Sequence, residues 1–256
     1  FASELGAEKF FNIKSQYGGL STNAVVLVAT IRALKYHGGV KLKDLNNENT
    51  EALILGLENL EKHVENIRYY GISPVIAINK FSTDTIAEIE IIKQKAAELN
   101  VKVSLVESWE KGGEGAVELA QMVIDSISDC SSCFKPLYDF KWTIEEKINE
   151  IATKMYGADH VEYSVQAKVD IAKINELGFG ELPVCVAKTQ KSLSDDQYRK
   201  GRPKGFTVKI REVQLASGAG FVIPIAGTIM RMPGLPEEPS AEIIDIDNDG
   251  VISGLF

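Results

Sequence analysis

Polar and aromatic side chains that could bind a ligand follow a short apolar run in this sequence. Residues 75–78 are all apolar, and Asn79, Lys80 and Phe81 come directly after them. An apolar run of this length is typical of a parallel strand that is covered on both faces. Ligands of open α/β sheets bind at the carboxyl ends of such strands. The sequence therefore predicts a strand that leads into a functional loop.

A second aromatic residue follows the next predicted strand. Trp109 comes after the strand expected at Val101–Val106 and precedes a glycine-rich stretch at residues 112–115. If the two strands are neighbours in the sheet, Phe81 and Trp109 could hold a planar ligand between their rings. A buried core tryptophan beside a flexible turn would explain the same residues. The sequence does not decide between a ligand-binding and a core role for Trp109.

The loop after residue 78 also resembles the guanine-reading Asn-Lys-x-Asp loop of GTPases. Its spacing differs, because Asp84 lies five positions after Asn79 instead of three. A plain polar loop explains the residues equally well. In that interpretation Ser82, Thr83 or Asp84 caps a helix that begins near Thr85.

A second glycine-rich stretch, Ala216–Phe221, could approach a phosphate or an adenine closely. It fits neither the dinucleotide-binding fingerprint nor the P-loop pattern, and a hairpin turn is at least as good an explanation. No Gly-x4-Gly-Lys-Ser/Thr sequence occurs in the chain. These 256 residues therefore show no motif for ATP chemistry of their own.

Metal sites are not predicted. Cys130 and Cys133 lack a second pair or a nearby histidine to complete a zinc site. Residues 245–250 begin like an EF-hand loop, but the twelfth position is Phe256 instead of Glu, so a tight turn between two strands is expected. The three histidines fit surface or capping roles better than ligand roles: His37, His63 and His160.

Strands and helices that alternate along the first half must position the candidate residues. Such alternation predicts an α/β fold with a parallel sheet flanked by helices. The predicted elements are a strand at 23–29, a helix at 51–70, a strand at 75–78, a helix at 85–100, a strand at 101–106 and a helix at 116–127.

The composition changes after residue 128, which predicts a first domain over 1–128 and a smaller α+β region over 129–256. Thr143 and Glu146 have the spacing of a capping box at the start of a helix that continues to Met155. The other elements expected in this region are a short helix over 163–177 and strands at 183–187, 206–213 and 221–225.

The overall composition is that of a globular protein that acts on small molecules. Hydrophobic residues make up 45% and charged residues 25% of the chain, and the net charge of −8 argues against nucleic acid as a partner. No apolar run reaches the roughly 18 residues that cross a membrane. Three cysteines and the lack of a leader-like segment favour the cytosol. A start at Phe1 instead of Met indicates a fragment or a processed chain.

Taken together, the motifs resemble formate–tetrahydrofolate ligase over essentially the whole chain. The stretches that carry the resemblance are Leu5–Phe11, Ala24–Gly39, Asn59–Ile67, Ala77–Thr85, Trp109–Gly115, Ala187–Gln190, Arg211–Val213, Ser217–Phe221 and Met232–Leu235.

The resemblance implies an ATP-dependent ligase that joins formate to tetrahydrofolate through formyl phosphate and gives 10-formyltetrahydrofolate. It implies a P-loop NTPase-like fold whose P-loop half is absent here, so that the chain resembles a carboxyl-terminal portion that is inactive alone and whose catalytic residues lie mostly in the missing half. Mg²⁺ accompanies ATP in this family, a monovalent cation is a candidate activator, and the expected assembly is a homotetramer. The alternatives are a non-catalytic folate-binding or oligomerisation fragment, or an inactive homologue. A GTPase-like switch is a distant third.

The resemblance also assigns binding residues. The folate rings would pack against Phe1, Phe81, Leu105 and Trp109. The nucleotide side would be formed by the stretches 188–194, 202–203 and 217–220. The individual candidates there are Lys188, Ser194, Pro203, Ser217, Gly218 and Gly220.

Overall fold

A three-stranded parallel sheet organises the first half of the chain. The computed structural model describes residues 2–128, 133–229, 238–239 and 242–254. The sheet has the order β1 (Val26–Ala29), β2 (Val75–Asn79) and β3 (Val103–Val106). Both pairings are parallel. The predicted mixed α/β architecture with a parallel sheet is therefore confirmed.

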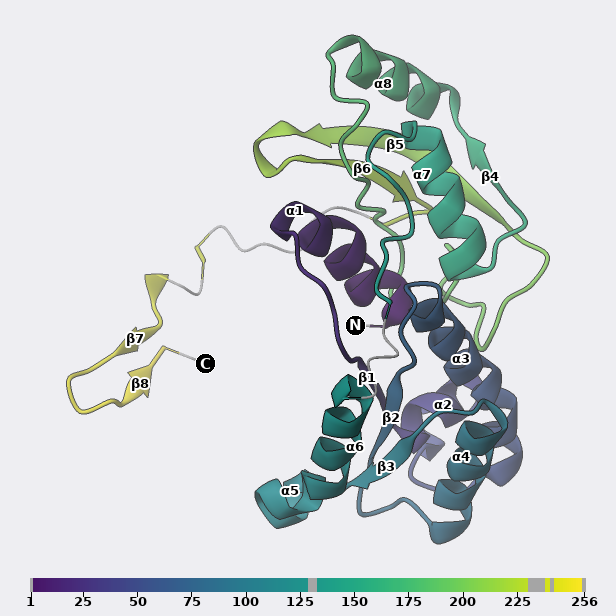
Figure 1. The fold of residues 1–256 in the computed structure, drawn as a ribbon, viewed down its shortest axis with the longest axis vertical. Coiled ribbons are helices and arrows are strands. Elements are labelled where there is room, and N and C mark those ends of the chain that lie inside the picture. Colours follow the sequence, from purple (N-terminus) through teal and green to yellow (C-terminus); the bar gives the residue numbers. More distant parts are fainter. Residues whose placement is uncertain (1, 129–132, 230–237, 240–241, 255–256) are drawn as a thin grey trace.

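Helices cover both faces of this sheet (Figure 1). On one side lie α2 (Ile31–His37), α3 (Thr50–Arg68) and α4 (Ile86–Glu98), and on the other lies α6 (Val117–Ser128). The apolar residues of α3 recur at helical spacing and are buried against the sheet: Leu53, Leu57, Leu60, Val64 and Ile67. The predicted helices over 51–70, 85–100 and 116–127 are confirmed to within two residues at each end.

Side-chain caps determine where these helices begin. The Thr30 hydroxyl accepts a hydrogen bond from the Ala33 amide, and the Asn49 side chain accepts one from the Ala52 amide. Thr85 caps α4 in a complete capping box with Glu88. The prediction that Ser82, Thr83 or Asp84 would cap α4 is wrong, because Glu88 stands three residues after Thr85, as the capping box requires.

A second sheet lies in the later half of the chain. Its order is β4 (His160–Tyr163), β5 (Thr207–Ala216) and β6 (Phe221–Ala226), with β4 and β5 parallel and β5 and β6 antiparallel. Its helices are α7 (Ile144–Glu150), which continues as a π-type turn at Ile151–Tyr156, and α8 (Val165–Glu176). The predicted capping box of Thr143 and Glu146 opens α7.

Two element predictions in this region need correction. Tyr163 ends β4 instead of starting a helix, and α8 begins after Ser164, whose hydroxyl accepts from the Ala167 amide. Residues 183–187 form no strand. They nevertheless pair with β6 through the bridges of Val184 to Val222 and Ala187 to Ile225, and the amides of Cys185 and Ala187 donate to carbonyls of β6. The apolar run is buried, because it lies along β6.

The amino-terminal segment packs against both halves of the chain. It is helical at Ser3–Ala7, Phe10–Ser15 and α1 (Gln16–Gly18), and Gly19 ends it in a left-handed conformation. Phe11 belongs to the hydrophobic core of the second sheet, together with Ile67 and Tyr70 from the end of α3. Residues from the first half thus complete the core of the later half.

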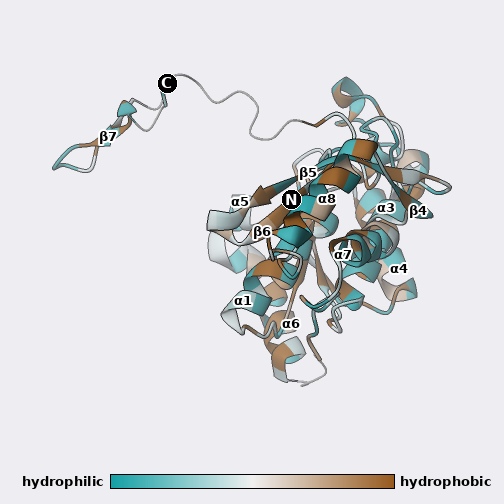
Figure 2. Cartoon of the chain, turned by 90° about the horizontal axis from the view of Figure 1, so that it is seen from above, coloured by the Kyte–Doolittle hydropathy of each residue, from teal (hydrophilic) through white to brown (hydrophobic). Residues whose placement is uncertain are grey.

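A short hairpin, β7 (Asp245–Ile246) and β8 (Ile252–Ser253), stands apart from the body of the molecule (Figures 1 and 2). An Asp247 carboxylate oxygen accepts hydrogen bonds from the amides of Asp249 and Val251, both at 2.9 Å. The predicted turn between two strands is therefore confirmed.

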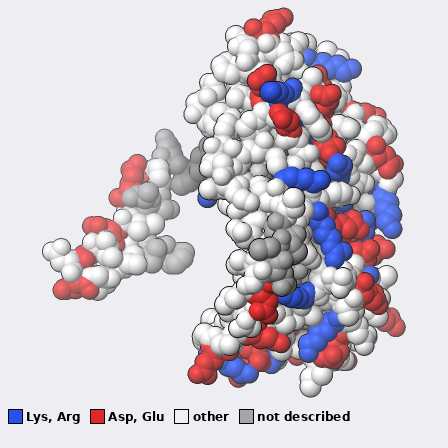
Figure 3. All heavy atoms as spheres, viewed as in Figure 1, with Lys and Arg blue, Asp and Glu red and all other residues white. Residues whose placement is uncertain are grey.

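The surface carries a mixture of charges. On the face drawn in Figure 3, Lys and Arg side chains are interspersed with Asp and Glu side chains mainly along the right-hand and lower parts of the body. In the described part of the chain, no helix has the length and apolar character needed to span a membrane.

Candidate functional site

The two aromatic residues singled out in the sequence lie at the same edge of the first sheet. β2 and β3 are direct neighbours, with Ile78 beside Leu105 and Asn79 beside Val106. The loops that leave their carboxyl ends therefore start next to each other. A pocket of about 410 Å³ opens between these loops, and its lining residues are Lys80, Phe81, Ser82, Glu107, Trp109 and Glu110.

Both aromatic rings are accessible to a ligand. The Trp109 side chain is 96% exposed and Phe81 is 39% exposed. The interpretation of Trp109 as a core tryptophan is therefore wrong. The residue lies on the four-residue helix α5 (Ser108–Lys111), which directly follows β3. An indole that makes so few contacts within the chain contributes little to folding and is available to stack on a planar molecule.

Backbone contacts hold the Trp109 segment against the sheet. The Glu107 amide donates to the Gly115 carbonyl at 3.0 Å and closes the turn that contains α5. A side chain at position 115 would not fit, because a Cβ atom there would lie 2.5 Å from the Glu107 carbonyl. Glycine at this position therefore allows the close backbone approach that presents Trp109 beside the end of β3.

A carboxylate fixes the Phe81 loop. One oxygen of Asp84 accepts the Phe81 amide at 2.8 Å, and the other oxygen is buried with no hydrogen-bond partner in the described structure. Burial raises the pKa of Asp84, although the bond from Phe81 opposes this effect. The residue that would complete a guanine-reading pattern thus binds its own loop backbone.

Glu107 joins the two sides of the pocket. Its carboxylate accepts hydrogen bonds from Lys80 and Lys111, both at 2.5 Å. The bond from Lys111, followed by the bond from Lys80, lowers the pKa of Glu107 to about 2. The carboxylate therefore stays ionised at neutral pH and ties the loop after β2 to α5.

We predict that Glu107 titrates near pH 2 in the folded chain instead of near its ordinary value of 4.5. Because this pKa is lowered by folding, the contribution of Glu107 to stability is complete above pH 4.5 and is lost as the pH falls through about 2. Carbon-detected NMR of the side-chain carboxyl measures the midpoint. Lys111→Met should move it upward, Lys80→Met should do so by less, and a wild-type midpoint near 4.5 would contradict the ion cluster.

The other residues predicted for the folate lie elsewhere or outside the described residues. Leu105 is half-buried on β3 and packs against the core of the first sheet, and it does not line the pocket. Phe1 lies outside the described residues. The sequence reasoning did not assign Ser82, Glu107 or Glu110 to the pocket, although they flank the two aromatic residues in sequence. Their position next to Phe81 and Trp109 in the sequence was the feature that could have identified them as lining residues.

The residues predicted for the nucleotide side fall into separate groups. Lys188 is buried, donates to the carbonyls of Thr189 and Ser192, and lies 3.7 Å from the Glu4 carboxylate. Ser194 is also buried and shares a hydrogen bond with the Ser192 hydroxyl at 3.0 Å. A cavity of about 190 Å³ beside this segment is lined by Thr189, Gln190, Lys191, Asp195, Gln197, Ala226, Thr228 and Ile229.

None of the individual nucleotide candidates lines that cavity, and the remaining ones lie elsewhere. Pro203 follows Arg202, whose guanidinium pairs with the carboxylate of Glu65 on α3 at 2.8 Å. Ser217 and Gly218 are exposed in the turn between β5 and β6, where Tyr17 donates to the Gly220 carbonyl at 2.6 Å. The structure therefore brings Lys188 and Ser194 together but separates them from the later glycine-rich turn.

His63 has a buried environment that the sequence did not predict. Its Nδ1 atom lies 2.7 Å from the Ser3 hydroxyl and 3.6 Å from the Glu4 carboxylate, and burial lowers its pKa. Serine and carboxylate approach the same ring nitrogen, so the group cannot act as a catalytic triad, in which they bind opposite nitrogens. The prediction of a surface or capping role is wrong, because Ser3 and Glu4 cover the ring from a distant part of the chain.

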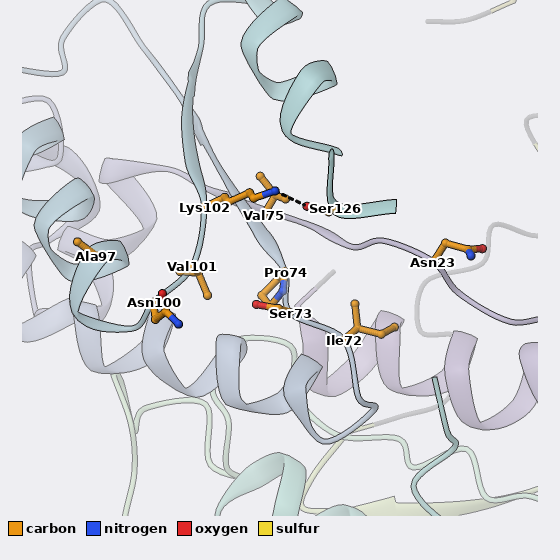
Figure 4. A pocket seen from close by; sticks show the side chains of 10 residues that line it. All are labelled: Asn23, Ile72, Ser73, Pro74, Val75, Ala97, Asn100, Val101, Lys102 and Ser126. Carbon is orange, nitrogen blue, oxygen red and sulfur yellow. Dashed lines mark hydrogen bonds between the residues drawn. The ribbon is translucent and has the colours of Figure 1, made fainter. Parts of the chain in front are cut away.

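A second cavity, of about 470 Å³, lies at the opposite edge of the first sheet. Figure 4 shows its lining, in which Lys102 approaches Ser126 at 3.5 Å from the entrance of β3. None of its lining residues is aromatic. They are Asn23, Ile72, Ser73, Pro74, Val75, Ala97, Asn100, Val101, Lys102 and Ser126. Ligands of parallel sheets bind at the other, carboxyl edge, which favours the pocket of Phe81 and Trp109 as the candidate site.

Within the described ranges, no cluster of three or more His, Cys, Asp or Glu side chains could hold a metal ion. A family model described as formate–tetrahydrofolate ligase matches residues 1–256.

Proposed function

Because the chain belongs to the formate–tetrahydrofolate ligase family, we propose that it binds tetrahydrofolate between Phe81 and Trp109 and serves the ATP-dependent ligation of formate to that folate. The observation that carries this proposal is the pocket of about 410 Å³ at the ends of β2 and β3, with one aromatic residue from each loop. The flat pterin and aminobenzoyl rings would stack on these side chains.

The proposed reaction proceeds through formyl phosphate. A formate oxygen attacks the γ-phosphorus of ATP and ADP leaves. A folate nitrogen then attacks the formyl carbon, the bond from this carbon to the phosphate oxygen breaks, and the nitrogen loses its proton. The first step needs cations around the transferring phosphoryl group. We assign these to the family's P-loop segment, to Mg²⁺ and to a monovalent cation, and we assign folate positioning to the present residues.

The proposal divides the work between two parts of the chain. Residues 1–128 would supply the folate pocket through Phe81 and Trp109. Residues 129–256 would face the nucleotide. Ser217 and Gly218 are exposed there, and a cavity is lined by Thr189 and Asp195, which follow Lys188 and Ser194 in the sequence. The family resemblance extends the proposal to a homotetramer in the cytosol.

Calorimetric titration of tetrahydrofolate and of ATP, each into the 256-residue chain, tests the proposal. We expect saturable heat with tetrahydrofolate, no saturable heat with ATP, and no formation of 10-formyltetrahydrofolate when formate is added. Absence of folate binding would overturn the assignment of the pocket. Synthesis of the product by this chain alone would overturn the assignment of phosphoryl transfer to another segment.

A further inference from the structure

Arg32 lies against the ring of Phe81. It is the second residue of α2, which begins directly after β1, and its guanidinium carbon is 5.5 Å from the centre of the Phe81 ring. β2 lies between β1 and β3. Phe81 follows β2, so it stands between Arg32, which follows β1, and Trp109, which follows β3. One side of the Phe81 ring thus meets a cation, and the pocket lies on the side toward Trp109.

Besides the ring of Phe81, the charge of the Asp84 carboxylate also attracts the guanidinium of Arg32. It forms no hydrogen bond and no ion pair with any residue that the structure describes, although the side chain is partly buried. A guanidinium carries five N–H donors and normally pairs with a carboxylate or a carbonyl when it is withdrawn from water. Its attraction to the face of Phe81 and to the charge of Asp84 therefore keeps it beside the Phe81 loop.

The backbone of Phe81 is fixed independently of Arg32. The Phe81 amide donates to Asp84 at 2.8 Å, and Asp84 immediately precedes the capping residue of α4. This bond fixes the backbone but leaves the side chain free to turn about its own bonds. The ring is 39% exposed, so the second restraint on its orientation must come from a side chain that contacts its face.

We propose that Arg32 is a positioning residue that holds the Phe81 ring in the orientation required for stacking on the folate. The inference rests on the proposed function. A ring that is held before the ligand arrives loses less conformational freedom on binding, so the restraint increases affinity. Because Phe81 separates Arg32 from the pocket, Arg32 acts through the ring and does not need to touch the folate.

A double-mutant cycle on the 256-residue chain tests this role, with tetrahydrofolate affinity measured by calorimetry. Arg32→Gln should weaken binding roughly threefold, as loss of an exposed cation–π contact predicts, and Arg32→Lys should restore most of the affinity. Phe81→Leu should weaken binding by more. Adding Arg32→Gln to Phe81→Leu should cause no further loss, because the ring on which Arg32 acts is gone.

The chain offers a matched control for this cycle. Arg199 lies over the ring of Phe206 at 5.9 Å, a similar pair outside the pocket, so Arg199→Gln should leave folate affinity unchanged. Unchanged affinity in Phe81→Leu would overturn the proposed folate site itself. If Phe81→Leu weakens binding but Arg32→Gln does not, or if the two losses add, the positioning role of Arg32 is wrong. Circular dichroism confirms that each variant is folded, and Arg32→Lys tests the role if Arg32→Gln does not fold.

Discussion

Replacing Trp109 by Ala is expected to weaken tetrahydrofolate binding roughly 100-fold, about 3 kcal/mol, which is typical of the loss of a central aromatic anchor. The thermal stability of the chain should not change, because the side chain is 96% exposed and its removal leaves no cavity. Calorimetric titration gives the affinity, and a thermal melt monitored by circular dichroism gives the stability. A large loss of affinity without a loss of stability is the signature of a residue whose main contact is the ligand.

The second tryptophan provides the control. Trp142 is 39% exposed and lies next to the capping residue of α7, away from the pocket of Trp109. Trp142→Ala should therefore leave folate affinity unchanged, and Trp109→Phe should retain part of the affinity because it keeps an aromatic face. Equal affinity of the wild-type chain and Trp109→Ala would rule out the proposed stacking.

Replacing Lys35 by Met is expected to destabilise the fold by about 4 kcal/mol, because it leaves the carboxylate of Glu88 buried without its counter-charge. The Lys35 ammonium donates to Glu88 and to the Asn47 carbonyl, both at 2.9 Å. Both side chains of the pair are completely or almost completely buried. Urea denaturation of the wild-type and variant chains measures the difference in the free energy of unfolding.

An exposed pair serves as the control for this prediction. Lys93 and Glu90 lie 2.8 Å apart at the surface, so Lys93→Met should cost less than about 1 kcal/mol. The double replacement of Lys35 by Met and Glu88 by Leu should recover much of the loss, because no unpaired charge then remains inside. A loss below about 1 kcal/mol in Lys35→Met alone would show that Glu88 finds another partner or is neutral.

The pair of Lys35 and Glu88 also makes the stability of the fold depend on pH in the acidic range. Burial opposes ionisation of Glu88, but hydrogen bonds from Lys35, Asn49 and Thr85 outweigh it and lower the pKa below its ordinary value of 4.5. The stabilisation is therefore complete above pH 4.5 and is lost as the pH falls through the lower pKa of the folded chain. Glu88 also joins α2, the start of α3 and the cap of α4, so its loss would loosen the loop that carries Phe81.

The sequence alone predicted the features of the site that depend on neighbours along the chain. The apolar run at 75–78 and the polar residues after it identified β2 and its loop. The helical repeat of α3 and the capping box of α7 were equally visible, because hydrophobic periodicity and capping require only residues within a few positions. Phe81 and Trp109 were selected on the same ground, since each follows the end of a strand.

Only the tertiary structure decided which distant groups meet. The contact of Arg32 with Phe81, the bridge of Glu107 to Lys80 and the cover of Ser3 over His63 join residues from different elements. No local pattern predicts such pairs, because their energies arise when strand order and helix packing bring the elements together. For the same reason the sequence could not decide between a core and a ligand-binding role for Trp109, whose side chain lies in solvent. Apolar character is a property of the residue, whereas burial depends on what the rest of the fold places beside it.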